Sequence, residues 1–217
     1  MSTYKLQIFF SDNELRAIYE TGANVIISKP SINGNDPNVA WQVFKPFNAN
    51  TITWEENYGI YASTSELKSG AELNQLAFIP IGASMGKLYK LESNATIDGP
   101  LSGGTKGFYT LTNNYSEGTI PETENSKKRI MTLGLFQDAN INGMNIKGNA
   151  VSAAPVLLGS TATMTPYSTV YIWLQSQIRS NTVVTTITSP KTALRFTDNM
   201  HEISVSYDID SGKFVSK

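Results

Sequence analysis

Short apolar runs of strand length, separated by turn-forming residues, limit how this chain can fold more than any other feature. The second half contains APVLLGSTATM, STVYIWLQ, NTVVTTIT, TALRFT, EISVSYDI and KFVS, at intervals of about eight to twelve residues. Such spacing is typical of antiparallel β-sandwiches and barrels. In EISVSYDI the apolar Ile203 and Val205 alternate with Ser204 and Ser206, so one face meets a core and the other meets water. We therefore predict an all-β fold, in the form of a two-sheet antiparallel sandwich.

The composition supports a β-rich chain. Ser, Thr and Asn number 22, 22 and 19, whereas charged residues make up only 16% of the 217 residues. Typical globular domains carry about 25% charged residues, while Ser, Thr and Asn suit exposed strand faces and turns. A chain of this length can bury about 70% of its unfolded surface on folding. We expect one sandwich domain over residues 1–217, and any domain seam would lie in the irregular loop region 98–130.

One short helix is expected near the N-terminus. Ser11 is a suitable N-cap, and Glu14 follows three residues later, which is the capping-box pattern. Leu15 and Ile18 then fall on one helical face. The sequence predicts an amphipathic helix over 12–20, and no other segment predicts one as clearly.

STVYIWLQ differs from the other strand candidates because both of its faces are apolar. Val170 and Ile172 lie on one side of the pleat, and Tyr171 and Trp173 lie on the other. This pattern predicts a central strand that is covered on both sides or that presents aromatic rings outward.

Charge and residue types exclude several classes of protein. The chain has 17 Lys and Arg, 18 Asp and Glu, one His and no Cys. It lacks the basic excess that nucleic-acid binding requires, and it offers no disulfide, thiolate or multi-histidine metal site. No run of about 18 apolar residues predicts a membrane-spanning helix, and the N-terminus lacks a secretory signal pattern. We expect a soluble protein made in the cytoplasm, which could leave the cell only by a non-classical route.

A serine-hydrolase motif is present in outline. Residues 82–86 read GASMG, which fits the G-x-S-x-G nucleophile elbow with Ser84 as nucleophile. His201 would be the base, and Asp198 or Asp138 would orient it. The segment after Ser84 is soon broken by Gly and Pro, however, so it predicts no supporting helix. The alternative is a plain turn between strands.

A calcium-loop opening is also present. DANING matches D-x-[DN]-x-[DN]-G, with Asp138, Asn140 and Asn142 as candidate ligands. The position that normally supplies a bidentate Glu is Asn149, so the site would hold one carboxylate and bind calcium weakly. The alternative is an Asn-rich β-turn, because Asn and Gly tolerate positive φ.

Aromatic residues are interleaved with Asn and Glu in two places, and this pattern is typical of sugar-binding sites. Rings can stack on the C–H faces of a sugar while amides and carboxylates bind its hydroxyl groups. Exposed Trp and Tyr are also found where proteins meet membranes. The third interpretation is that these rings are core residues. The candidate ligand-binding residues are Trp41, Trp54, Glu55, Asn57, Tyr58, Tyr61, Tyr171 and Trp173.

The sequence leaves four functions open. The leading hypothesis is a non-catalytic, lectin-like binding protein that recognises carbohydrate or a cell surface. A toxin component that binds membranes or forms pores is second, because weakly charged β-rich chains with exposed aromatics can dock on lipid. A Ser hydrolase is third. A self-assembling, homo-oligomeric structural protein is fourth, because low net charge favours association.

The stretches ELRAIYETGANVIISKP and VAWQVFKPFNANTITWEENYGIYAS resemble a type of small bacterial and fungal protein with no established activity. The resemblance covers about the first third of the chain. It implies a compact, non-secreted, β-rich protein, and it assigns a role to no residue.

Overall fold

A computed structural model describes residues 2–34, 36–116 and 130–217. The described residues form 19 strands and one helix, so the all-β class is confirmed. The strands are distributed over four hydrogen-bonded sheets of nine, four, four and two strands.

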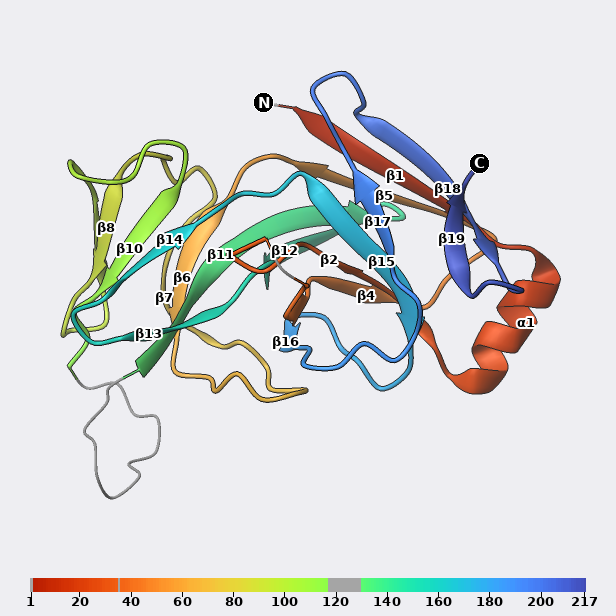
Figure 1. Cartoon of the computed structure of the whole chain (residues 1–217), viewed down its shortest axis with the longest axis horizontal. Helices are drawn as coiled ribbons and strands as arrows, with labels where there is room; N and C mark the ends of the chain where they lie inside the picture. The colour runs from red at the N-terminus through yellow and green to blue at the C-terminus, as the bar shows by residue number, and fades with distance from the viewer. Residues whose placement is uncertain (1, 35, 117–129) are drawn as a thin grey trace.

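The nine-stranded sheet, called the large sheet below, extends through most of the molecule (Figure 1). It comprises β1 (Thr3–Phe9), β5 (Ala49–Glu55), β6 (Gly59–Ser63), β7 (Gln75–Ile79), β11 (Ile130–Ile141), β12 (Met144–Ala150), β13 (Ala154–Leu157), β18 (Glu202–Asp208) and β19 (Lys213–Ser216). The order of the strands is β19-β18-β1-β5-β11-β6-β7, and β12 and β13 both pair with the long strand β11.

The other three sheets are smaller. The β10 sheet contains β14 (Thr161–Met164), β10 (Tyr109–Asn113), β8 (Leu88–Leu91) and β9 (Ile97–Leu101), in that order. The β15 sheet contains β17 (Thr192–Arg195), β15 (Thr169–Gln175), β2 (Asn24–Ser28) and β4 (Gln42–Phe44), in that order. The last sheet pairs β3 (Val39–Ala40) with β16 (Thr182–Val183).

This arrangement differs from the predicted two-sheet antiparallel sandwich. The described part of the chain forms four sheets, and two of its strand pairs, β1 with β18 and β8 with β10, are parallel. A parallel pair needs a long connection between its strands. Nearly the whole chain separates β1 from β18, and β9 lies between β8 and β10 in sequence, so both pairs meet this condition.

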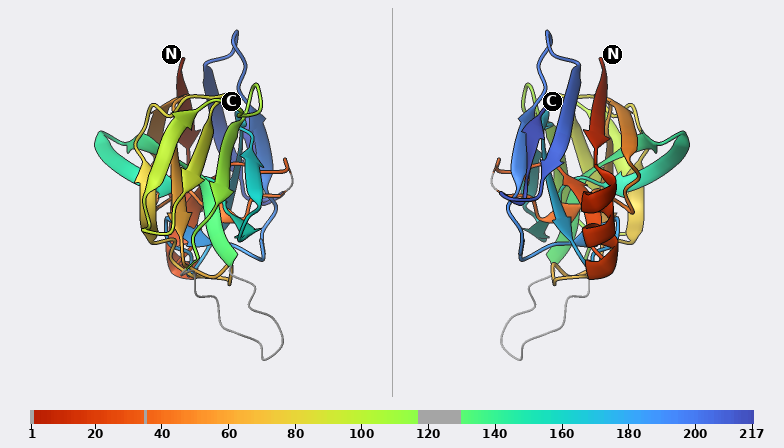
Figure 2. Two further views of the ribbon diagram at one scale, coloured as in Figure 1. Left: turned by 90° about the vertical axis from the view of Figure 1, so that its left-hand side faces the viewer. Right: turned by 90° about the vertical axis from the view of Figure 1, so that its right-hand side faces the viewer.

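One core cluster joins the three larger sheets. It contains Leu6 and Ile52 of the large sheet, Ile27 and Val170 of the β15 sheet, and Leu111 of the β10 sheet. The β10 sheet lies at one end of the molecule, the β15 sheet lies nearer the middle, and α1, β18 and β19 lie at the other end (Figures 1 and 2). The single-domain expectation stays a prediction, and residues 117–129 of the expected seam region lie outside the described residues.

The helix α1 (Asp12–Thr21) confirms the N-terminal prediction. Ser11 and Glu14 form both hydrogen bonds of the capping box, and Gly22 ends the helix in the left-handed conformation, with φ of 65°. Leu15 and Ile18 are buried as expected. No helix in the described ranges is long and apolar enough to cross a bilayer.

The central position predicted for STVYIWLQ is confirmed. Strand β15 lies between β17 and β2, with Val170, Ile172 and Trp173 buried. Trp173 belongs to a small separate cluster with Ile26 and Val184, which covers the second face of the β15 sheet.

Candidate functional site

A groove of about 350 Å³, lined by polar residues but mostly by apolar surface, lies where the end of β5 meets the hairpin formed by β11 and β12. Its polar lining residues are Thr3, Thr53, Glu55, Asn57, Asp138, Asn140, Asn145 and Lys147. Ile81 and Ile146 supply an apolar part of the wall. The groove therefore contains residues from both segments that the sequence analysis selected, the aromatic and Asn-rich stretch and the DANING motif.

Strand alternation places the β5 side chains. Ile52 and Trp54 point into the core, and Thr53 and Glu55 point the opposite way. Glu55 is exposed and Asn57 is partly exposed, so both side chains can reach a ligand in solution.

The β11–β12 hairpin forms one side of the groove and projects from the body of the molecule (Figure 2). Its two turn residues are Asn142, with φ of 51°, and Gly143, with φ of 88°. An Asn-Gly pair with positive φ at both positions matches the twist of an antiparallel hairpin. A β-bulge between Gln137 and Ala139 adds a local bend beside Asp138.

The three candidate calcium ligands each accept a hydrogen bond from a backbone N–H. Asp138 Oδ1 lies 2.8 Å from Gly148 N. Asn140 Oδ1 lies 2.9 Å from Gly143 N, and Asn142 Oδ1 lies 2.7 Å from Thr51 N. These oxygens thus stabilise the hairpin by binding backbone N–H groups. This is what we expect if the segment is an Asn-rich β-turn. Over the described ranges, no group of three or more His, Cys, Asp or Glu residues is placed to hold a metal ion.

Most of the candidate aromatic residues are buried. Trp41, Tyr58, Tyr61 and Trp173 are at most 1% exposed, and Trp54 is 3% exposed. As placed, these five rings belong to the core and offer no face on which a sugar could stack. Both faces of the large sheet are covered at this point, because Tyr61 packs in a second buried cluster with Val39 and Phe136.

Tyr171 differs from the other candidate rings because it is only partly buried. The ammonium of Lys191 lies 5.6 Å from the centre of its ring. Tyr171 does not line the groove, so of the sequence candidates the groove contains Trp54, Glu55, Asn57, Asp138 and Asn140.

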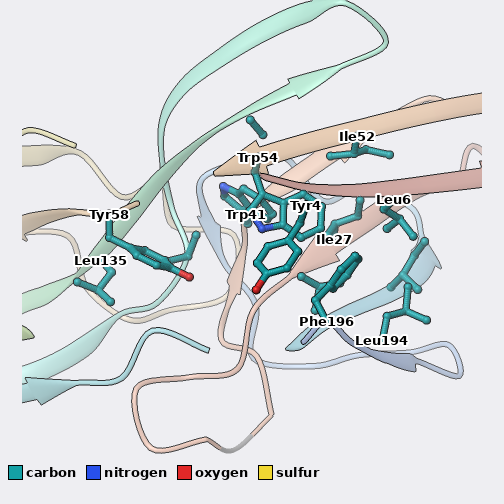
Figure 3. Close-up of a cluster of buried hydrophobic side chains, with 14 of the residues drawn as sticks. Tyr4, Leu6, Ile27, Trp41, Ile52, Trp54, Tyr58, Leu135, Leu194 and Phe196 are labelled. Atoms are coloured by element: carbon teal, nitrogen blue, oxygen red, sulfur yellow. The ribbon is translucent and has the colours of Figure 1, made fainter. Parts of the chain in front are cut away.

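A buried polar cluster surrounds Lys29, at the end of β2. Lys29 is 2% exposed, and its Nζ lies 2.9 Å from Glu56 Oε1 and 2.5 Å from the Tyr58 hydroxyl. Its ammonium is 4.8 Å from the centre of the Tyr58 ring, and it lies near the rings of Trp41 and Trp54. Figure 3 shows the rings of Trp41 and Trp54 close together in the core, with Tyr58 to one side of them.

Burial governs the protonation of this cluster. It lowers the pKa of Lys29, while the negative charge of Glu56 acts in the opposite direction. Burial, followed by the charge of Glu56, raises the pKa of Tyr58 well above its ordinary value. The same two causes, in the same order, raise the pKa of Tyr109 to about 12. Because Lys29 is almost fully enclosed, the cluster is suited to joining the layers of the fold rather than to binding a ligand.

Sequence reasoning missed Lys29 and Glu56. A weak signal was present, because Lys29 directly follows the apolar run NVIIS, and Glu56 lies two residues from both Trp54 and Tyr58. Burial of the lysine nevertheless depends on a partner 27 residues away, which no local pattern identifies.

The structure does not bring the candidate hydrolase residues together. Ser84 lies in the turn between β7 and β8, so a strand follows it where a nucleophile elbow requires a helix. His201 precedes β18, and β1, β5, β11 and β6 lie between β18 and β7 in the large sheet. The His201 ring stacks on Tyr4 at 5.3 Å, and its Nε2 is 2.6 Å from the backbone carbonyl oxygen of Asp198 rather than from its carboxylate.

No protein-family model matches the chain, and no curated sequence or solved structure does so either. The chemistry of the groove is therefore what indicates a function. That chemistry consists of two carboxylates, three amides, one ammonium and two hydroxyls around a groove whose exposed lining is mostly apolar.

Proposed function

We propose that this protein is a non-catalytic binding protein whose groove binds a saccharide or a similar small polyhydroxylated ligand of a cell surface. One observation carries the proposal. Glu55 and Asn57, at the end of β5, share the groove with Asp138 and Asn140 of β11, although the two segments are far apart in sequence.

The lining suits hydroxyl groups, which both donate and accept hydrogen bonds. Glu55 and Asp138 accept, Lys147 donates, and the amides of Asn57 and Asn145 do both. Such mixed donors and acceptors can bind neighbouring hydroxyls of a sugar ring, and Ile81 and Ile146 can contact its C–H face.

The size of the groove indicates weak binding of a single small ligand. A volume of about 350 Å³ lies at the lower end of the range for small-molecule sites. At about 0.3 kcal/mol per ligand atom, a single sugar ring of about 12 heavy atoms would have a dissociation constant on the order of 1 mM. At that affinity the groove would be filled only where the local concentration of ligand is high, as on a glycan-covered surface.

The test is binding of the labelled protein to a glycan array, once with calcium and once with chelator. We expect saturable binding to one class of glycan, and at least tenfold weaker binding by the variant Glu55→Ala/Asn57→Ala. The matched control is Asn13→Ala/Glu20→Ala, which removes the same side-chain types from the exposed face of α1. The control should bind like the unmodified chain.

Three other outcomes are informative. Loss of binding in chelator would mean that a calcium ion at Asp138, Asn140 and Asn142 is part of the site. Equal binding by both double variants would contradict the groove as the site. No binding in either buffer would contradict the proposal, and release of dye from liposomes would then favour the membrane-active alternative.

A further inference from the structure

A second hollow, of about 320 Å³, lies beside α1, at the end of the molecule where α1, β18 and β19 lie (Figure 1). It is separate from the groove. Strand β1 begins beside the groove, which Thr3 lines, and ends next to α1. A ligand in this hollow would therefore contact none of the residues that line the groove.

The wall of this hollow combines apolar surface with hydroxyl groups. Ile18 of α1, Leu174 of β15 and Tyr207 of β18 supply apolar side chains. Thr188 and Ser189, in the segment between β16 and β17, supply hydroxyls. Sites for small molecules typically combine apolar surface with a few polar groups that orient the ligand. The hollow is therefore suited to a small molecule with an apolar body and a polar group.

The charge of the hollow comes from Glu14, which is the one charged residue among its described lining residues. Its Oε2 accepts the capping hydrogen bond from Ser11 N–H at 2.6 Å, which leaves Oε1 available to a ligand. Glu14 forms no ion pair within the described part of the chain. Burial raises the pKa of Tyr207, and the nearby negative charge of Glu14 raises it further. The hollow thus presents a carboxylate together with an aromatic residue.

We propose that this hollow binds a small organic ammonium, with the cation at Glu14 and the apolar body against Leu174 and Tyr207. The carboxylate attracts the cation and accepts a charge-assisted hydrogen bond from it, and an aromatic ring nearby adds to the attraction. The hydroxyls of Thr188 and Ser189 can accept further hydrogen bonds from the ammonium. An uncharged ligand of the same shape lacks the charge-assisted bond and should bind more weakly.

Two matched probes test the proposal. Benzylamine is protonated at neutral pH and benzyl alcohol is uncharged, so they differ only in the group that meets Glu14. Backbone amide chemical shifts of the isotope-labelled protein report where each probe binds. For benzylamine we expect a dissociation constant on the order of 1 mM, with shifts centred on residues 14–23, 174–176 and 207–209. Benzyl alcohol should bind at least tenfold more weakly. Equal binding of the two probes, or shifts centred outside the hollow, would overturn the proposal.

The variant Glu14→Gln isolates the charge, because Gln can also serve in a capping box and the helix cap is kept. We expect it to weaken benzylamine binding at least tenfold and to leave benzyl alcohol binding unchanged. The control Glu20→Gln removes the same charge from an exposed position of α1 outside the hollow, and it should bind benzylamine like the unmodified chain. Equal weakening by both variants would mean that the overall charge attracts the amine, which would contradict a site at Glu14.

A third variant, Ala17→Leu, tests the space itself. Ala17 lies on α1 and lines the hollow, and Leu is nearly as favourable in a helix as Ala. The larger side chain occupies part of the hollow, so benzylamine should bind at least tenfold more weakly. Far-ultraviolet circular dichroism and thermal unfolding show whether the variant stays folded. Unchanged benzylamine binding by the folded variant would contradict binding in this hollow.

Discussion

At the scale of single residues, the buried ion pair of Lys29 and Glu56 is the most demanding interaction in the fold. Lys29 is enclosed, whereas the Glu56 side chain is 19% exposed and reaches water. Glu56→Gln leaves the enclosed ammonium without its counter-charge, and we expect it to lower the free energy of unfolding by about 3–5 kcal/mol. Lys29→Met removes the buried charge and leaves a carboxylate that water can reach, so its loss should be smaller. Urea unfolding of both variants measures the difference, and equal losses would contradict this account.

Among the elements, the β11–β12 hairpin matters most for the groove, because its backbone geometry shapes one side of it. Asn142 has positive φ, and its Oδ1 accepts a hydrogen bond from Thr51 N–H at 2.7 Å. Asn142→Ala loses the hydrogen bond and strains the turn, so the free energy of unfolding should fall by about 1–3 kcal/mol. Asn142→Gly loses the same side-chain hydrogen bonds, with Thr51 N–H and with Asn50 Oδ1, but it does not strain the turn, so it should cost less. Thermal unfolding of the two variants decides this, and a larger loss for the Gly variant would count against the turn geometry.

Elements specified by local residues could be predicted, and those that depend on distant partners could not. The helix cap at Ser11 and the central position of β15 followed from patterns of a few neighbouring residues. The parallel pair of β1 and β18 joins the two ends of the chain, and no local pattern encodes it. Glu55 and Asn57 line the groove, and their role in ligand binding stays a prediction. The indole of Trp54 faces the core, because strand alternation turns it away from its neighbours.

At the scale of the whole molecule, the buried tyrosines make the fold sensitive to alkali. Burial raises the pKa of Tyr58, Tyr61 and Tyr109 above their ordinary value of 10.0, to about 12 for Tyr109. Below pH 10 their contribution to stability is fully present. Above pH 10 the unfolded chain loses phenol protons that the folded chain keeps, so the free energy of unfolding falls as the pH rises toward 12.

Lys29 acts in the opposite direction. Its pKa is lowered on folding from 10.5, so between its folded and unfolded pKa values the unfolded chain binds more protons and stability rises with pH. Three tyrosines change the free energy of unfolding more than one lysine does, so we expect the protein to be less stable above pH 10. Far-ultraviolet circular dichroism and tyrosinate absorbance, followed together against pH, should show that the buried phenols ionise only as the fold is lost. Ionisation of all tyrosines in a fully folded protein would contradict this.

The proposed ligand site is the groove between β5 and the β11–β12 hairpin, which we expect to bind a polyhydroxylated molecule. The most direct test is to titrate the isotope-labelled protein with a sugar identified on the glycan array and follow its backbone amide chemical shifts. We expect saturable shifts concentrated in residues 53–57 and 138–147. Shifts centred elsewhere, such as the hollow beside α1 lined by Glu14 and Tyr207, would contradict it.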